Sequence, residues 1–488
     1  MSASAVAIAA PHRAAVAAAE ESVRRGGNAV DAALAAAAAL TVVYPHQCSL
    51  GGDLVALVHL PGGAVSAVLS IGAAPLDAVR PNGSRMPRQG AGSVTVPGVV
   101  AGWQALARHA RLSPAEPLRH AADLARAGVA VSPGLAHAVA DRRDAVSADP
   151  GLRALLLDGD EVRTMLRQPR LADTLDALAA DPASFYRGEV AAKLVGFLRG
   201  GGSRLSTTDF ERHEAEIAKP LVLDAPGGRW YVAPPPSQGA VLLAVLGGMA
   251  ETDLVELCRR AAATRDRLLG DPRSGPVDVD GLLRAGEPAG AGTATRAAGD
   301  TVAVTAVGDD GLAVSLIQSV YQSFGAGLLD PDTGIVLHNR GSAFSLEPGH
   351  PAEFGPGRRP PHTLCPALGA AEGVLLAAGC QGGRAQPQIL AQTVPELLDP
   401  GTDPAAVLAR PRWVVGARDL GYERETVLAE PGSLPGAVTL PVATTEGPVD
   451  EAGHVQIARL AGTRLEAASD PRADGGAVVL APHKEDRS

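Results

Sequence analysis

The sequence predicts a large, layered protein of mixed α and β structure. Its 488 residues are several times the length that one ordinary core requires, so either two domains or one large layered body is expected. Some stretches alternate apolar and polar residues with the period of a strand, and others repeat apolar residues with the period of a helix. Hydrophobic residues form 46% and charged residues 20% of the chain, which favours neither a disordered nor a fibrous class.

The first part of the chain predicts a strand, two helices and a hairpin. The segment AVAIAAP is typical of a short strand, and a helix over 13–25 follows and ends at the glycine pair 26–27. Asn28 can cap a second helix, over 29–41, whose apolar residues cover every side and predict full burial. After a turn at 49–53, LVALVHL and AVSAVLSI indicate a hairpin of buried strands.

Helical patterns dominate the middle of the chain and give way to a linker. From 99 to about 195 the periodicity predicts a helical layer, after which RWYVA indicates a strand and the prolines at 234–236 a rigid loop. The residues of 280–300 are small and polar and predict a flexible linker. TVAVTAV and LAVSLIQSV then form a predicted hairpin around an Asp-Gly turn. The linker is therefore expected to run directly into a buried strand whose first residue is Thr301.

Composition and charge exclude several kinds of function. The chain carries 43 basic and 53 acidic residues, a formal charge of −10, and no run of Lys or Arg that could follow a phosphate backbone, so nucleic acid is not an expected partner. No apolar stretch is long enough to cross a membrane, and the N-terminus has no basic residue ahead of an apolar core. A cytoplasmic protein is the expectation.

Cysteine and histidine spacing indicates no metal site. The four cysteines lack CxxC spacing and are expected to be buried free thiols: Cys48, Cys258, Cys365 and Cys380. Five histidines belong to no set of ligands and are expected at the surface or as helix caps: His12, His46, His120, His213 and His454.

Thr301 is the candidate nucleophile because of its position between the linker and the strand. A threonine that opens a strand is by itself ordinary, since β-branched residues favour strands. An N-terminal threonine, however, can attack with its hydroxyl while its own α-amino group, with a pKa near about 8, accepts the proton. Cleavage of the chain after Asp300 would create such a residue.

A second pair of residues supports the same chemistry. Acyl transfer requires donors aimed at the developing oxyanion, and the N–H groups of Gly382 and Gly383 could supply them without interference from side chains. The alternative for a Gly-Gly pair is a plain turn.

Many segments together resemble the γ-glutamyltranspeptidases, a family of N-terminal nucleophile hydrolases, and the resemblance covers nearly the whole chain. It is found, in order, in GGNAVDAALAAAAALTVVYP, VPGVVAGW, VAPPPSQG, GDTVAV, DGLAVSLIQSVYQSFGAG, GIVLHNRGSAFS, PGRRPPHTLCPAL and GCQGGRAQPQ. Single pieces are weak signals, whereas so many in one order are specific.

The resemblance implies an α+β fold, a four-layer αββα sandwich built from a large-subunit segment, 1–300, and a small-subunit segment, 301–488. It places the nucleophile on Thr301, a supporting hydroxyl on Ser319 and the oxyanion hole on Gly382 and Gly383. It also implies self-cleavage before Thr301, an acyl-threonine intermediate and transfer of the acyl group to water or an amine. No metal and no cofactor are implied. The implied partners are a small-molecule amide and the two subunits of the cleaved chain, and homo-oligomer formation is left open.

The residues that would recognise a glutamyl group have changed. Ile71 stands where the family has an arginine for the α-carboxylate, and Ala343 where it has an acid for the α-amino group. Tyr321 replaces an asparagine, and Arg340 a glutamine or glutamate. His362 and Thr363 occupy the loop that holds hydroxyl groups near the substrate carboxylate in the family.

These changes predict an acyl group that is anionic but lacks an α-amino group, because an arginine suits a carboxylate and the acid that would bind an ammonium is gone. The glutaryl-cephalosporin acylase and oxamate amidohydrolase branches, which the chain also resembles, have this character. One alternative is a γ-glutamyl enzyme that uses another residue, such as Arg384, for binding. A second is an inactive relative that serves as a binding or scaffold protein, and Val302, where many relatives have a second threonine, leaves self-cleavage open.

Overall fold

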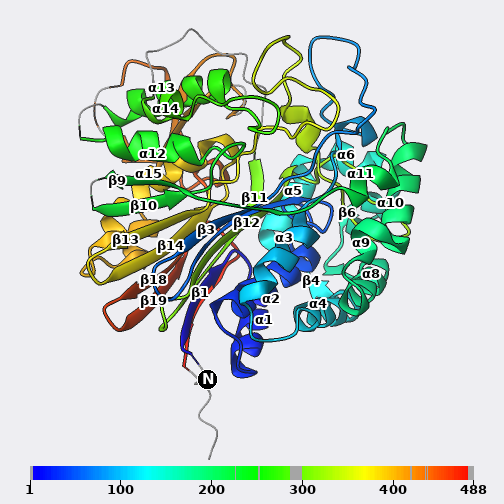
Figure 1. Ribbon diagram of the computed structural model, residues 1–488, viewed down its shortest axis with the longest axis horizontal. Coiled ribbons are helices and arrows are strands. Elements are labelled where there is room, and N and C mark those ends of the chain that lie inside the picture. The colour runs from blue at the N-terminus through cyan, green and yellow to red at the C-terminus, as the bar shows by residue number, and fades with distance from the viewer. Residues whose placement is uncertain are drawn as a thin grey trace, which may run out of the picture.

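Two antiparallel sheets face each other in the computed structural model (Figure 1). It describes residues 4–225, 227–250, 253–285, 299–417, 420–434, 436 and 438–481, and the backbone alone at 299 and 300. The first sheet has the order β20 (Gly476–Leu480), β1 (Val6–Ala10), β11 (Gly299–Gly308), β12 (Ala313–Gln322), β2 (Asp53–His59), β3 (Val65–Ser70) and β8 (Glu216–Ala218).

The second sheet is also antiparallel throughout. Its order is β19 (Arg464–Ser469), β18 (Val455–Ala461), β14 (Val374–Cys380), β13 (Ala367–Ala371), β10 (Gly228–Val232) and β9 (Leu221–Ala225). A three-stranded sheet lies beside it, formed by β15 (Trp413–Gly416), β16 (Thr426–Ala429) and β17 (Val442–Thr444).

Small and branched apolar side chains fill the space between the two large sheets. The first sheet contributes Val55, Leu57 and Ile317, and the second contributes Leu368 and Ala377, all of them fully buried. Because side chains alternate between the faces of a strand, the other face of each sheet is left for helices.

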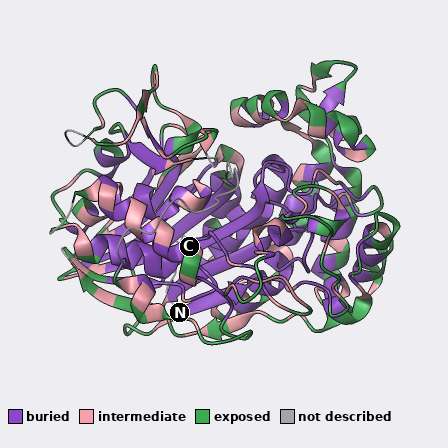
Figure 2. Ribbon diagram, turned by 90° about the horizontal axis from the view of Figure 1, so that it is seen from above, coloured by how far each residue is buried: buried purple, intermediate pink, exposed green. Residues whose placement is uncertain are grey.

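Helices cover that outer face of each sheet (Figure 1). The first sheet is covered by α1 (Arg13–Arg24), α2 (Ala29–Val43) and α3 (Val99–Leu106), and outside these helices pack α4 (Ala115–Ala127), α8 (Pro169–Ala180), α9 (Ser184–Arg187) and α10 (Glu189–Gly200). The second sheet is covered by α12 (Gly239–Gly248), α15 (Gln386–Thr393) and α16 (Pro404–Leu408), and α13 (Leu254–Leu268) packs on α12. Buried residues concentrate in the strands and the helices that touch them (Figure 2).

The remaining helices are short. They are α5 (Pro133–Asp141), α6 (Arg143–Ala148), α7 (Pro150–Leu156), α11 (Thr207–Glu211) and α14 (Val279–Leu283). Two short strand pairs interrupt the helical region, β4 (Val129–Ala130) with β7 (Met165–Leu166) and β5 (Leu157–Asp158) with β6 (Glu161–Val162). The prediction of a helical layer over 99–195 did not include these strands, because two residue pairs give no detectable period in the sequence.

The helix after Asn28 confirms the expectation of full burial. All 15 residues of α2 are buried, and Asn28 caps it by accepting hydrogen bonds from the N–H groups of Val30 at 2.9 Å and Asp31 at 3.1 Å. The Asp31 carboxylate in turn accepts a hydrogen bond from the Asn28 N–H at 2.9 Å, which completes a capping box. This helix packs on β11 and β12 and supports them from behind.

The strand that carries Thr301 begins earlier than predicted. Backbone pairing with β12 already joins Gly299 to Gln322 and Asp300 to Tyr321, so β11 starts at Gly299. The predicted linker over 280–300 is also helical at its start, where α14 covers Val279–Leu283. The rest of that prediction, at 286–298, lies outside the described residues.

The α+β class with antiparallel sheets is confirmed, and all four cysteines are buried free thiols as expected. The histidine prediction was partly wrong. His12 caps α1 by accepting a hydrogen bond from the Ala14 N–H at 3.1 Å, but His46 and His454 are buried and His213 is half-buried. Their burial arises from chain segments that meet only in the folded protein.

Candidate active site

Thr301 lies at an irregular point of the central strand pair. The register between β11 and β12 shifts between Asp300 and Val302, so that the single residue Thr301 lies opposite both Ser319 and Val320. A bulge of this kind redirects a side chain out of the regular pleat. The Thr301 Oγ1 donates a hydrogen bond to the Ser319 Oγ at 3.1 Å, and both residues are buried.

The backbone beyond Ser319 holds this hydroxyl in place. The Tyr321 N–H donates to the Ser319 Oγ at 2.8 Å. Tyr321 itself has φ at +78°, a conformation that a bulky residue adopts only where its surroundings impose it. Strain of this kind is common at functional sites, and here it turns the Tyr321 ring towards Arg340.

Gly382 and Gly383 form a tight turn after β14 and lie against β11. Gly382 has φ at +135°, and a Cβ atom there would lie 2.4 Å from the Ile389 Cδ1, so that only glycine fits. Neither backbone N–H group donates a hydrogen bond to any described residue. Two unpartnered amides at the end of a buried strand are suited to an oxyanion.

One buried glutamine joins this turn to the loop at Thr363. The Gln238 Nε2 donates to the carbonyl oxygens of Thr363 at 2.6 Å and Gly383 at 2.8 Å. Its Oε1 in turn accepts a hydrogen bond from the Arg265 Nη1 at 2.9 Å. The Gln238 side chain, just after the prolines at 234–236, therefore ties the two segments together.

Arg340 is a buried cation without a described counter-ion. Its side chain is 1% exposed, its guanidinium carbon lies 3.6 Å from the centre of the Tyr321 ring, and its Nη2 donates to the Thr363 Oγ1 at 3.1 Å. Its Nε and Nη1 have no hydrogen-bond partner among the described residues. Burial lowers the pKa of Arg340 to about 10, so the group stays charged at neutral pH.

Buried cations are normally paired, because removing a charge from water is unfavourable unless an opposite charge compensates for it. Arg340 has a favourable ring contact and one hydroxyl acceptor, which do not compensate for a full charge. The arrangement is therefore suited to an anionic ligand that would supply the missing acceptors.

His362 is turned away from this gap and towards an acid that the sequence had not indicated. The His362 Nε2 lies 3.3 Å from the Asp53 Oδ2, and the Nδ1 of His338 lies 3.5 Å from the same oxygen. All three side chains are fully buried. Asp53 had been assigned only to a turn and His338 to no role, and the 309 positions between Asp53 and His362 leave no local signal that they meet.

Arg384, the alternative binding residue, is already paired. Its guanidinium contacts the Asp266 carboxylate, and its backbone oxygen accepts a hydrogen bond from the Arg265 Nη1 at 3.0 Å. Ile71 is 2% exposed and lies in the core between the sheets. The structure thus brings Thr301, Ser319, Tyr321, Arg340 and Thr363 into one chain of contacts, and Arg384 belongs to a separate ion pair.

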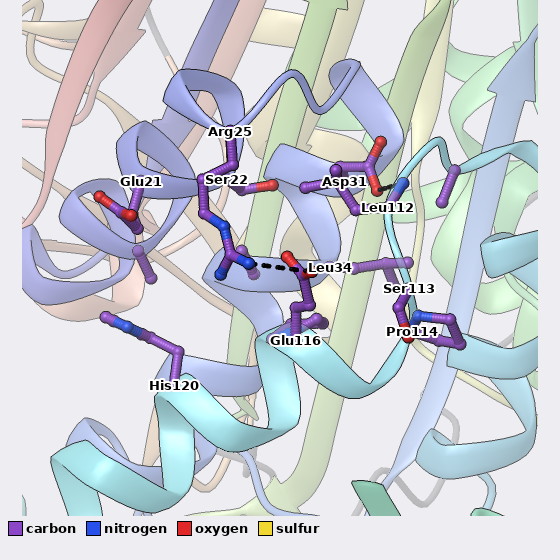
Figure 3. Close-up of a pocket in the computed structure, with 14 residues that line it drawn as sticks. Glu21, Ser22, Arg25, Asp31, Leu34, Leu112, Ser113, Pro114, Glu116 and His120 are labelled. Atoms are coloured by element: carbon purple, nitrogen blue, oxygen red, sulfur yellow. Dashed lines mark hydrogen bonds and ion pairs between the residues drawn. The ribbon is translucent and has the colours of Figure 1, made fainter.

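A separate pocket lies on the helical side, between α1, α2 and α4 (Figure 3). Its arginine and its aspartate already have partners. Arg25 pairs with Glu116 at 3.0 Å, and the Asp31 carboxylate accepts from the N–H groups of Arg111 at 2.8 Å and Leu112 at 3.0 Å. This pocket is a packing feature, and Thr301 does not line it.

Within the described part of the chain, no group of three or more His, Cys, Asp or Glu side chains has the arrangement of a metal site. The helices described there are too short or too polar to cross a membrane.

A buried threonine hydroxyl near the start of a central strand, with glycine amides on a turn against that strand, is the arrangement that the resemblance to the N-terminal nucleophile hydrolases implies. The family model for γ-glutamyltranspeptidase matches residues 15–480. The chain is 36% identical to the oxamate amidohydrolase proenzyme of Klebsiella pneumoniae subsp. pneumoniae, over 96% of this chain and 97% of that protein. It is 35% identical to a glutathione hydrolase-like proenzyme of Bacillus subtilis, over 86% of each.

A solved structure has the same fold. The cephalosporin acylase from Bacillus halodurans superposes with a TM-score of 0.84 at 28% identity, over 98% of this chain and 96% of that one. The chain belongs to the γ-glutamyltranspeptidase family and is an enzyme of the amide hydrolase and acyltransferase type. Its relatives include amidohydrolases, acylases and glutathione hydrolases.

Proposed function

We propose that this enzyme hydrolyses the amide of a short anionic acyl group, with oxamate as the candidate substrate, and that Thr301 becomes its nucleophile after the chain cuts itself before that residue. The observation that supports the substrate class is Arg340, buried with two guanidinium nitrogens that have no described partner. Oxamate carries a carboxylate next to its amide carbonyl and has no ammonium group, in keeping with Ala343 at the position of the family's acid. The name of the Klebsiella relative supports the same choice.

The reaction needs no group beyond those of the chain and water. The Thr301 Oγ1 attacks the amide carbon while its proton passes to the free α-amino nitrogen of the same residue. The negative charge that develops on the carbonyl oxygen is stabilised by the N–H groups of Gly382 and Gly383. The C–N bond then breaks, the proton goes to the leaving ammonia, and an ester of Thr301 remains. Water attacks this ester, releases the acyl group as oxalate and restores the hydroxyl.

Two side chains assist the reaction. Arg340 would hold the substrate carboxylate, and Ser319 would orient the Thr301 hydroxyl through their 3.1 Å hydrogen bond. Transfer to an amine instead of water would use the same ester. This proposal also includes the four-layer αββα description, the division of the chain into subunits 1–300 and 301–488, and a cytoplasmic location.

A γ-glutamyl substrate is less well supported. It would require an acceptor for its ammonium group and a cation for its α-carboxylate, and the corresponding positions hold Ala343 and the buried Ile71. Arg384, the substitute cation considered from the sequence, is engaged by Asp266.

Ammonium release from oxamate, compared with release of nitroaniline from glutaryl and γ-glutamyl p-nitroanilides, tests the proposal. We expect turnover of the anionic substrates that lack an α-amino group, and no turnover by a Thr301→Ala variant, which should also remain one chain. A clear preference for the γ-glutamyl compound would refute the substrate assignment, and full activity of Thr301→Ala would refute the mechanism.

A further inference from the structure

Asp53 is a buried acid whose negative charge acts on the Arg340 guanidinium. Of the described acidic residues, it is the one that raises the pKa of that guanidinium, against the lowering by burial. Yet Arg340 makes no hydrogen bond and no ion pair with it. A buried carboxylate and a buried guanidinium in the same region would normally pair, so their separation needs an explanation.

The Asp53 carboxylate is occupied on both oxygens. The Oδ1 accepts a hydrogen bond from the Gly72 N–H at 3.1 Å. The Oδ2 faces the Nε2 of His362 at 3.3 Å and the Nδ1 of His338 at 3.5 Å. Burial would raise the pKa of Asp53, but the charge of His338 and the contacts from both histidines outweigh it and hold the pKa well below its ordinary value.

The protons on the two histidines follow from their other contacts. The His362 Nδ1 accepts from the Leu364 N–H at 3.3 Å, so the proton of a neutral ring lies on Nε2 and points to Asp53. The His338 Nε2 lies 2.9 Å from the Thr95 carbonyl oxygen and must carry a proton to bond to it. The His338 Nδ1, on the other side of the ring, faces the Asp53 Oδ2 at 3.5 Å.

The Asp53 carboxylate is therefore engaged without Arg340. The Gly72 N–H and the two histidine rings face its oxygens, and the Nε and Nη1 of Arg340 keep no partner among the described residues. Asp53 lies directly opposite Ser319 in the pairing of β2 with β12, so this cluster sits behind the residue that supports the nucleophile.

On the basis of the proposed function, we propose that Asp53, His338 and His362 act as positioning residues that determine specificity, by holding the Asp53 carboxylate away from Arg340 so that the guanidinium stays available for a substrate carboxylate. The two histidines face an anion that could otherwise compete with the substrate. The ligand class is an amide whose acyl part carries one carboxylate.

The test is a double-mutant cycle on two residues. A His338→Gln change removes one of the two rings that face the Asp53 carboxylate, so this carboxylate should compete for Arg340. The measured quantity is kcat/KM for oxamate divided by kcat/KM for pyruvamide, which has a neutral methyl ketone in place of the carboxylate. We expect this ratio to fall by about tenfold or more in His338→Gln, an effect of the size that contacting residues commonly have on one another. The change should appear as a higher KM for oxamate.

The double variant Asp53→Asn/His338→Gln removes the competing anion and should recover most of the lost ratio. Recovery by a second substitution is what a charge role predicts, because two changes in a merely structural cluster would add their damage. A double variant whose ratio is as low as that of His338→Gln would overturn the proposal. The pair His362→Gln and Asp53→Asn/His362→Gln gives the same comparison through the other histidine if His338→Gln does not fold.

This outcome is distinct from failure of the proposed function. If the wild-type enzyme shows no preference for oxamate over pyruvamide, the substrate proposal is wrong and the cluster has no carboxylate to protect. If the wild type does prefer oxamate but the double variant does not recover, the substrate proposal stands and the role of the cluster is refuted.

Discussion

Arg340→Met separates a binding role of Arg340 from a structural one. Methionine keeps most of the length of the aliphatic stem and removes the charge, the Thr363 contact and the contact with the Tyr321 ring. For an anionic substrate the variant loses charge-assisted hydrogen bonds inside a buried site, a change of about 3 kcal/mol. Because each ~1.4 kcal/mol is a tenfold change, kcat/KM for oxamate should fall about 100-fold.

The stability of the free enzyme should respond in the other direction. A buried arginine that holds the fold together lowers the free energy of unfolding when it is removed. Arg340 lacks a described counter-ion, so its removal relieves a desolvation penalty that offsets the loss of roughly 1–2 kcal/mol from the ring contact. We expect the free energy of unfolding of Arg340→Met in urea to equal or exceed that of the wild type.

The assay compares oxamate with neutral pyruvamide, and Arg384→Met serves as the matched control. Arg384 is a neighbouring arginine already paired with Asp266, so its loss should lower stability and affect both substrates alike. Equal losses of oxamate and pyruvamide turnover in Arg340→Met, or a large loss of stability, would refute the inference that this cation awaits a substrate anion.

Three further outcomes follow from the geometry. Gly382→Ala should lower kcat about 100-fold with little change in KM, because the added Cβ would lie 2.4 Å from Ile389 and displace the amides. An unchanged kcat in steady-state kinetics would contradict this. Ser319→Ala should slow both turnover and chain cleavage about tenfold by removing the 3.1 Å hydrogen bond to Thr301, and rates equal to the wild type would argue against that support. Burial lowers the pKa of His46 to about 3, so proton uptake below pH 6.5 favours the unfolded chain, and stability should be lost as the pH falls from 6.5 towards 3. The free energy of unfolding in urea should fall by about 2 kcal/mol between pH 7 and pH 5 in the wild type, and by less in His46→Gln. Equal losses in the two proteins would rule out His46 as the source.

Local patterns predicted the elements that position the nucleophile. The alternation in TVAVTAV and LAVSLIQSV predicted the β11–β12 hairpin, and the apolar run after Asn28 predicted the buried α2. The bulge opposite Thr301 and the start of β11 at Gly299 were missed, because both depend on pairing with β12 and not on residue type.

Charge relations in the site could be predicted only in part. Replacement of a polar residue by Arg340 indicated an anion, but its burial and lack of a described partner are properties of the fold. The contact of Asp53 with His338 and His362 joins strand β2 to two distant loops, and no local pattern marks it. His362 was expected near the substrate and instead faces Asp53, because its backbone is tied to the proline loop by a 2.7 Å hydrogen bond to the Pro236 oxygen.

The N-terminal sequence of the smaller fragment of the purified protein tests the central claim most directly. Denaturing electrophoresis should separate two chains, and the smaller should begin Thr-Val-Ala-Val at Thr301, with the Thr301→Ala variant remaining whole. Active enzyme that consists of one intact chain, or a smaller fragment that begins at any other residue, would contradict the account.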